Sequence, residues 1–191
     1  MKIFLLIMLT LITSGNSNLG AKKSFIPYEV IMGYADLIVE GEISKVNENS
    51  YEFKIFNNLK SKINTGNKII VNNFQEWTCD KRIVSSKVGQ KLLLFLTITE
   101  NKTYEIINGS TGELFIEDVE REFSYDFKFN NYLDIKRGIQ MFGNSYKFTG
   151  KNKNRRFIQL VCDIRIKELE NKSMFFKSLS NKVKMKYQIE K

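Results

Sequence analysis

Apolar and polar residues alternate with period two from Ala35 to Phe56, and this alternation is the clearest structural signal in the sequence. In both halves of the stretch every second residue is apolar or small: Leu37, Val39, Gly41 and Ile43, then Tyr51, Phe53 and Ile55. The pattern predicts two half-buried antiparallel strands. The polar residues 47–50 predict the turn between them. Because Gly41 lies in the middle of the first strand, it predicts a bend, a bulge or a close backbone approach.

Further short segments extend this pattern towards the middle of the chain. Residues 68–74, 104–107 and 113–116 predict strands, and the almost wholly apolar 91–99 predicts a central strand covered on both faces. The asparagine and glycines of Asn108–Gly112 favour positive φ and predict a hairpin connection. Five or six short strands at this spacing predict a closed or nearly closed antiparallel barrel. The expected fold is mainly β with one or two helices, the barrel having five antiparallel strands.

Helical spacing appears before and after the predicted barrel. Val30, Ile31 and Tyr34 predict a short helix that leads into the first strand. Asn131 is expected to cap a second helix that Gly143 ends. Its apolar residues recur at helical spacing: Tyr132, Ile135, Ile139 and Phe142. This helix should lie against the barrel or close its open end.

The C-terminal part of the chain returns to alternation. Apolar residues at every second position in 158–166 and 183–189 predict two strands. The first segment also fits a helix through Phe157, Leu160, Val161 and Ile164, although strands are favoured. The expected organisation is a signal peptide at 1–21, a barrel with its packing helix at 22–143, and a C-terminal β extension at 144–191.

The N-terminus has the order of a secretory signal peptide. Lys2 precedes the apolar residues 3–12, and small or polar residues follow, so that cleavage after Ser17 or Ala21 is expected. The apolar run is too short to cross a bilayer as a helix, and a buried N-terminal helix is the alternative. The protein is therefore expected to be secreted or periplasmic, with no transmembrane span in the mature chain.

Export makes the two cysteines informative, because an oxidising compartment favours pairing. Cys79 and Cys162 have only each other as partners within the chain. A disulfide between them would stabilise the fold by about 4–5 kcal/mol on the chain-entropy model. The alternative is two separate buried thiols.

The net charge of +9 inclines the protein towards acidic partners outside the cytoplasm, either a protein or an acidic polymer. Lys151, Lys153, Arg155 and Arg156 form a basic cluster in a predicted hairpin tip. An exported protein rarely meets nucleic acid and charged loop tips are usually solvated, so we expect no nucleic-acid partner.

Histidine is absent from the sequence, which excludes Ser-His-Asp and Cys-His catalysis and every histidine-ligated metal site. Two cysteines without a CxxC pair exclude structural zinc and thioredoxin-like redox chemistry. Only paired carboxylates remain for catalysis. Glu40 and Glu42 lie on one face of the first strand, but a solvated strand face explains them better than glycoside chemistry. We expect no enzyme activity, no catalytic residue, no metal and no cofactor.

Two segments carry the candidate binding residues. In the loop 75–89, Trp77 is a large aromatic side chain that either anchors a partner or covers a disulfide. The charged residues after it are further candidates for partner binding: Asp80, Lys81 and Arg82. The loop 108–112 offers backbone amides that bind an anion if they form a nest, and its candidate residues are Asn108, Gly109, Ser110 and Gly112. A plain hairpin turn is the favoured interpretation of this second loop.

The order of these elements resembles the netrin-like, or tissue-inhibitor-of-metalloproteinase-like, OB-fold domains of secreted proteins. The resemblance is carried by Pro27, by Ala35-Asp36 and Glu40-Gly41 in the first strand, and by Gly89-Gln90 before the central strand, and it covers residues 25–116 with the helix at 132–142. It implies an OB-like barrel and secretion. The metalloproteinase inhibitors of that family chelate zinc with an N-terminal cysteine, and no cysteine here matches that position.

The expected function is a secreted, non-catalytic binding or interaction module that engages partners through the loop 75–89 and its neighbours. Protease inhibition by surface occlusion is the alternative, and a polysaccharide hydrolase using acidic residues is a third, weaker class.

Overall fold

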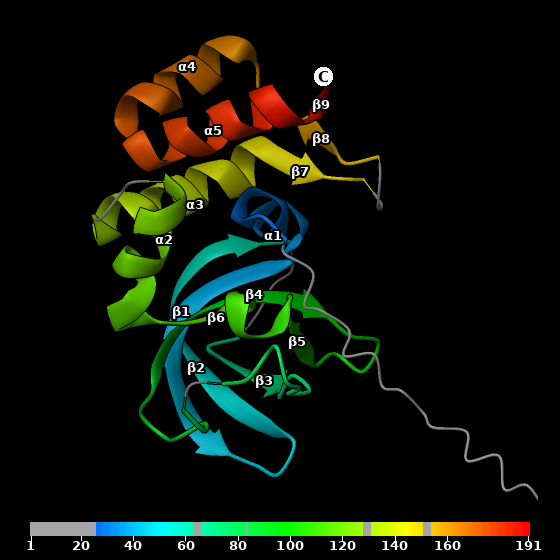
Figure 1. Ribbon diagram of the computed structural model, residues 1–191, viewed down its shortest axis with the longest axis vertical. Coiled ribbons are helices and arrows are strands. Elements are labelled where there is room, and N and C mark those ends of the chain that lie inside the picture. Colours follow the sequence, from blue (N-terminus) through cyan, green and yellow to red (C-terminus); the bar gives the residue numbers. More distant parts are fainter. Residues whose placement is uncertain (1–25, 63–65, 83, 128–130, 151–153) are drawn as a thin grey trace, which may run out of the picture.

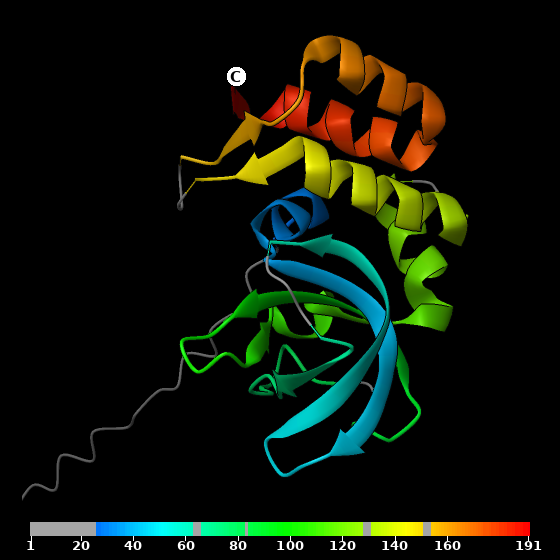
Figure 2. The same cartoon turned by 180° about the vertical axis from the view of Figure 1, so that it is seen from behind.

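A computed structural model describes residues 26–62, 66–82, 84–127, 131–150 and 154–191 (Figure 1). The predicted signal peptide at 1–21 lies outside these residues, as do Lys151 and Lys153 of the predicted basic cluster. Figures 1 and 2 show a β-barrel at one end of the molecule and a layer of helices with a small sheet at the other.

Five strands close into the barrel, and a sixth extends its sheet. The six strands are β1 (Leu37–Val46), β2 (Ser50–Ser61), β3 (Lys68–Asn72), β4 (Lys91–Ile98), β5 (Tyr104–Ile106) and β6 (Glu113–Phe115). They are hydrogen-bonded in the order β1-β2-β3-β5-β4-β6, and β1 also pairs with β4. The expected barrel is thus confirmed.

The expectation that all strand pairs are antiparallel is wrong, because β3 and β5 run parallel. The other barrel pairs are antiparallel. A closed ring with an odd number of strands cannot have every neighbouring pair antiparallel. Closure of five strands therefore requires one parallel pair, whatever the sequence of the individual strands.

The position of β4 between two hydrophobic clusters explains why its sequence does not alternate between apolar and polar residues. Leu92, Leu94 and Leu96 belong to the cluster that fills the barrel, whereas Leu93 and Phe95 belong to a second cluster between the barrel and the helices. Both faces of the strand are buried. The prediction of a central strand covered on both sides is confirmed.

At Gly41 the backbones of β1 and β2 approach each other closely. The register between these strands shifts between Glu40 and Gly41, and a Cβ atom at Gly41 would lie 2.1 Å from the carbonyl oxygen of Lys54. Only glycine permits this approach. The predicted bulge is present.

The segment Asn108–Gly112 is not a hairpin turn. Gly109–Gly112 form the 3₁₀ helix η1, and β5 and β6 on either side of it pair successively with the same edge of β4. The segment 107–112 thus interrupts what is otherwise one continuous strand, formed by β5 and β6 along β4. The expected positive φ is present at Asn108 (59°) and Gly109 (56°).

Three helices cover the barrel: α1 (Tyr28–Tyr34), α2 (Val119–Phe127), which follows the short 3₁₀ helix η2 (Ile116–Asp118), and α3 (Tyr132–Ser145). The expected helices α1 and α3 are present, and the side chain of Asn131 caps α3 by accepting a hydrogen bond from the amide of Asp134 at 3.1 Å. Helix α3 continues through Gly143 to Ser145, so the predicted end is wrong. The sequence analysis missed α2, whose buried residues recur every four positions: Val119, Phe123 and Phe127.

The C-terminal layer contains β7 (Tyr146–Phe148), β8 (Arg156–Gln159), α4 (Asp163–Lys172), α5 (Met174–Lys186) and β9 (Gln188–Glu190). The prediction of two strands here is largely wrong. Only the start of 158–166 is strand, and most of 183–189 is the end of α5 or the short β9. None of the helices in the described part of the chain is long and apolar enough to span a membrane.

Helix α5 forms because its buried residues follow helical spacing from Phe175 onward. This spacing begins eight residues before the alternating stretch 183–189, which suggested a strand. Phe175, Phe176, Leu179 and Val183 are all buried, whereas Met185 is 75% exposed. The hydroxyl of Ser173 caps the helix by accepting from the amide of Phe176 at 3.0 Å. The buried face extends from residue 175 and outweighs the local alternation near the C-terminus.

The predicted disulfide is absent. Cys79 and Cys162 are both free and exposed. Cys79 lies in a tight turn of the loop beside the barrel, where Trp77 and Asp80 bridge, and Cys162 precedes α4 in the C-terminal layer. Sequence offered only one possible partner for each cysteine, but the fold places the two in different layers.

We expect thiol titration of the unreduced, folded protein to detect both sulfhydryls, because both are exposed. The double variant Cys79→Ser/Cys162→Ser should melt within about 2 °C of the wild type, since exposed substitutions usually change stability by less than about 0.5 kcal/mol. A loss of several kcal/mol in that variant would contradict the free-thiol structure.

Candidate functional site

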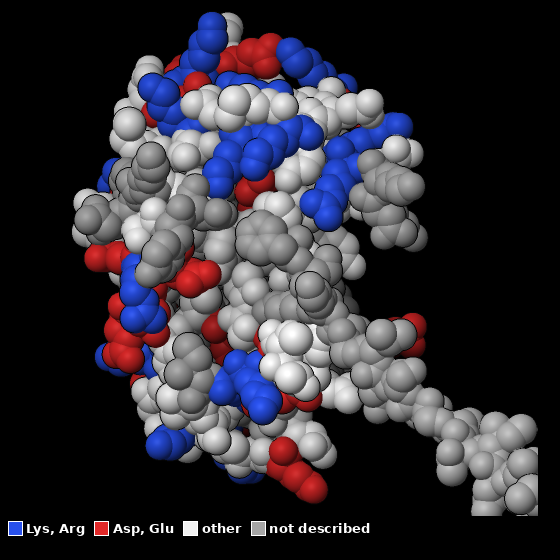
Figure 3. Space-filling model, viewed as in Figure 1, with Lys and Arg blue, Asp and Glu red and all other residues white. Residues whose placement is uncertain are grey.

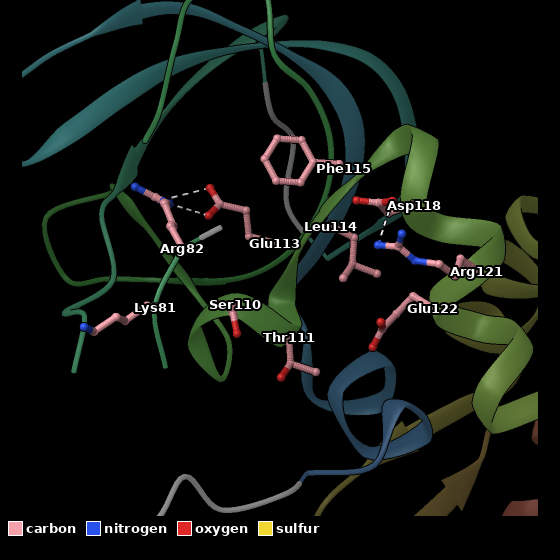
Figure 4. Close-up of a pocket in the computed structure, with 10 residues that line it drawn as sticks. All are labelled: Lys81, Arg82, Ser110, Thr111, Glu113, Leu114, Phe115, Asp118, Arg121 and Glu122. Carbon is pink, nitrogen blue, oxygen red and sulfur yellow. Dashed lines mark hydrogen bonds and ion pairs between the residues drawn. The ribbon is translucent and has the colours of Figure 1, made fainter. Parts of the chain in front are cut away.

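The two segments that sequence analysis selected for binding meet at one cleft (Figure 4). The loop 75–89 contributes Lys81 and Arg82, and the segment from η1 into α2 contributes the remaining side chains: Ser110, Thr111, Glu113, Leu114, Phe115, Asp118, Arg121 and Glu122. The cleft has a volume of about 190 Å³. This suits one side chain or a small polar group rather than a large ligand.

Asp80 connects the two loops. Its side chain is buried, and Oδ1 accepts a hydrogen bond from the amide of Ser110 at 3.1 Å. A Cβ atom at Gly109 would lie 1.9 Å from Oδ2 of Asp80, so the carboxylate rests directly against the glycine. The predicted anion-binding loop therefore binds an anion that belongs to the chain itself. Asp80 has a structural role and does not face a partner.

Arg82 is also directed inward, where it forms a bidentate ion pair with Glu113 of β6 (Figure 4). Its Nε donates to Oε2 at 2.6 Å, and its Nη2 donates to Oε1 at 2.9 Å. The two side chains are only 10% and 6% exposed. Two parallel charge-assisted bonds in such a buried place fix the loop on the barrel.

The surroundings supply further hydrogen-bond partners for this pair. Nη1 of Arg82 donates to Asn73 at 3.0 Å and to Ser86 at 2.8 Å, and its guanidinium lies 4.8 Å from the ring centre of Phe74. The hydroxyl of Tyr51 donates to Oε1 of Glu113 at 2.8 Å. Burial and the neighbouring Glu113 carboxylate raise the pKa of Tyr51 well above its usual value, so the phenol remains a donor.

Other residues of the loop 75–89 face solvent. Lys81 is exposed, and it forms no ion pair within the part of the chain that the structure describes. Trp77 is half-buried in the turn that its backbone forms with Asp80, with reciprocal N–H···O distances of 3.1 and 2.9 Å. Val84 and Val88 are exposed. Because the disulfide is absent, the interpretation of Trp77 as its cover is wrong, and a partner anchor remains.

Acidic and basic groups balance one another around the cleft. Asp118 pairs with Arg121 at 2.9 Å, and Glu122 accepts a hydrogen bond from the hydroxyl of Tyr28 at 2.8 Å. Among the described residues no group of three or more histidine, cysteine or acidic side chains could hold a metal. The arrangement offers hydrogen-bonding groups and two exposed cations, of which Arg121 is paired with Asp118 and Lys81 has no ion pair among the described residues.

Glu40 and Glu42 are engaged in ion pairs on the barrel surface. Glu40 forms an ion pair with Lys136 of α3 and accepts a hydrogen bond from Asn57 at 3.1 Å, and Glu42 lies 4.0 Å from Lys54. Glu40 thereby connects the barrel to α3. The placement favours the structural interpretation of both carboxylates.

Arg155 and Arg156, the two residues of the predicted basic cluster that the structure describes, lie in different surroundings. Arg156 pairs with Glu190 at 3.0 Å, whereas Arg155 is exposed and borders a cavity beside α1. Arg156 begins β8, which pairs antiparallel with β7, and Arg155 directly precedes it.

Comparison with known proteins gives no match, either to a family model or to a curated sequence. The site therefore has to be interpreted from its own geometry. Sequence reasoning selected Asp80, Arg82 and Gly109, but it missed Glu113 and Tyr51, which decide what Arg82 does. No spacing signal connects these residues, since they come from three separate strands or loops.

Proposed function

We propose that the protein is a secreted, non-catalytic binding module built on an OB-like, netrin-like barrel. The strand order supports the OB-like assignment, because a five-stranded Greek-key barrel with a packed helix is the architecture of that class. The N-terminal signal pattern supports secretion. The partner is a protein or an acidic polymer outside the cytoplasm.

One observation carries this proposal: two buried charged contacts fix the loop 75–89 and leave Lys81 exposed at the cleft, with Trp77 half-buried in the same loop. A loop held in one conformation loses little entropy on binding, and such preorganisation raises affinity. Tryptophan is one of the residues enriched in binding hot spots. The exposed lysine favours an acidic group on the partner.

The same fixed loop favours a second function, protease inhibition by surface occlusion. Val88 is 66% exposed and Val84 is also exposed, so the loop presents apolar side chains that a protease groove can accept. Inhibition assays against a panel of proteases distinguish this function, because a binding module without inhibitory action leaves every protease active.

Capture of the partner tests the proposal. The wild-type protein, immobilised and exposed to culture supernatant or envelope extract, should retain a partner that Trp77→Ala and Lys81→Glu each bind at least about tenfold more weakly, as expected of hot-spot residues. Lys167→Glu is the matched control, since Lys167 is an exposed lysine of α4 in the C-terminal layer. If Lys167→Glu weakens capture as much as Lys81→Glu, the contact is only general charge attraction and the loop is not the site.

A further inference from the structure

The net charge of the protein is concentrated at one end of the molecule. Residues 144–191 contain 13 basic and 4 acidic residues, whereas residues 1–143 contain 17 of each. The C-terminal residues form α4, α5 and the small sheet, which lie away from the barrel in Figures 1 and 2. Figure 3 shows Lys and Arg side chains gathered over this end of the molecule. The C-terminal layer is therefore positively charged, while the rest of the chain has no net charge.

The acidic residues of this layer are too few to neutralise it. Each of them already forms an ion pair with a basic residue of the same layer: Asp163 with Lys191, Glu168 with Arg165, Glu170 with Lys184 and Glu190 with Arg156. Five lysines are exposed and have no ion pair within the described part of the chain: Lys147, Lys167, Lys172, Lys177 and Lys186. Their charges are available to a partner.

Helices α4 and α5 lie side by side and run antiparallel, so that their polar faces meet along one seam (Figures 1 and 2). Glu170 of α4 accepts hydrogen bonds from Lys184 at 2.6 Å and from Ser180 at 2.7 Å, both in α5. Two turns earlier in α4, Asp163 pairs with Lys191 at 2.6 Å. Since a helix rises about 1.5 Å per residue, these two acidic residues lie about 10 Å apart along α4.

Lysines outnumber carboxylates along this α4–α5 seam. Lys167 lies four residues after Asp163 and three before Glu170, so helical spacing places it on the same face of α4 as both. Although burial opposes the shift, Lys184 and the charge of Lys177 hold the pKa of Glu170 below its usual value, which places Lys177 near the seam as well. We call four residues the seam lysines: Lys167, Lys177, Lys184 and Lys191.

The other residues of the layer indicate which class of polyanion it fits. Among the described residues the exposed aromatic side chains are Tyr34 and Phe56, both outside 144–191, so the layer offers no platform for stacking nucleobases. Its exposed apolar residues are divided between the two ends of the helix pair, with Ile164 and Met185 at one end and Met174 at the other. Binding in a membrane surface needs one continuous apolar face. Lysines bind anions as separate point charges, without the bidentate geometry of arginine.

We propose that the α4–α5 seam binds a linear polyanion, an acidic polysaccharide outside the cell. The seam lysines contact successive acidic groups along one polymer chain, and the positive potential of the whole C-terminal layer attracts the polymer. The choice of a polysaccharide rests on the secretion proposed above, whereas the binding of a polyanion follows from the charges of the layer. The polymer is a ligand distinct from the partner of the loop 75–89.

Fluorescence anisotropy with labelled oligogalacturonate, a chain of carboxylated sugars, tests the proposal on the whole protein. We expect binding at about 50 mM salt that weakens about tenfold or more at about 200 mM, because bound counterions are released. Lys167→Glu/Lys177→Glu should weaken binding about tenfold or more at the lower salt concentration. The matched control is Lys68→Glu/Lys91→Glu, which changes two exposed lysines of the barrel and lowers the net charge equally, and it should weaken binding less than about threefold.

Three results would overturn the proposal: no binding at the lower salt concentration, equal loss in the two double variants, or tighter binding of anionic lipid vesicles or single-stranded DNA at the same concentration of negative charge. Trp77→Ala should bind oligogalacturonate as the wild type does, so failure of the seam and failure of the loop 75–89 are observed separately. Circular dichroism checks that each variant folds. Lys167→Gln/Lys177→Gln removes the same charges without reversing them and should also weaken binding severalfold if charge reversal unfolds the helices.

Discussion

Arg82→Met should lower the free energy of unfolding by about 3–5 kcal/mol, the usual cost of removing one partner from a buried ion pair. The variant leaves the Glu113 carboxylate buried beside Tyr51 without its cation, although the two side chains of the pair are only 10% and 6% exposed. Methionine retains most of the apolar stem, so the loss reports the charge rather than a cavity. Urea unfolding of the wild type and the variant measures the difference.

A double variant tests whether the instability of Arg82→Met comes from the unpaired charge of Glu113. Arg82→Met/Glu113→Leu removes both charges and should recover most of the lost stability, because an apolar pair of similar volume often replaces a buried ion pair without cost. Lys81→Met is the control, since Lys81 is exposed, and it should change stability by less than about 0.5 kcal/mol. If Arg82→Met proves as mild as Lys81→Met, the loop 75–89 is not fixed by this contact.

Lys60 should make the stability of the protein depend strongly on pH. This lysine of β2 is 7% exposed, and its Nζ donates to the carbonyls of Met32 at 2.6 Å and Gly33 at 3.2 Å, near the C-terminal end of α1. Burial, followed by repulsion from Lys62, lowers the pKa of Lys60 to about 7, even though Asp36 opposes the shift. Lys147 adds further repulsion.

The free energy of unfolding should rise with pH, because the unfolded chain binds the Lys60 proton more tightly than the folded protein does. Between pH 7 and about 10 the unfolded chain holds a proton on Lys60 that the folded protein has released, so the free energy of unfolding rises with pH. From pH 7 to pH 9 the increase should be roughly 2–3 kcal/mol, at 1.36 kcal/mol per pKa unit. Below pH 7 both states are protonated, and Lys60 contributes no further pH dependence.

Urea unfolding at several pH values between 6 and 9 measures this effect and avoids the ionisation of tyrosines. Lys60→Met should remove the increase, whereas Lys91→Met, at an exposed position of β4, should retain it. A wild-type stability that stays constant from pH 7 to 9 would show that Lys60 keeps its proton in the folded protein.

Local sequence patterns predicted the barrel strands well. Tyr51 and Phe53 of β2 fill the barrel, as alternation required, and the apolar run of β4 is covered on both faces. Gly41 marked the bulge before any partner strand was known. These features depend on side-chain direction within one strand, which a period-two pattern specifies directly.

The same reasoning failed where a short segment fits both the period-two pattern of a strand and the spacing of a helix. Alternation at 183–189 suggested a strand, but the buried face of α5 begins at Phe175 and requires the helical period. The four-residue spacing of Val119, Phe123 and Phe127 was present in the sequence and was missed. Tertiary burial decided between periods that the local sequence leaves ambiguous.

The sequence by itself determined the strands of the barrel, the lack of histidine chemistry and the residue types of the two candidate loops. Only the tertiary structure decided that one strand pair must be parallel, that Cys79 and Cys162 lie apart, and that Asp80 and Arg82 face inward while Lys81 faces solvent. The physical reason is that a charge acquires its role from the partner that folding brings to it, and Glu113 lies 31 residues away from Arg82 in the chain.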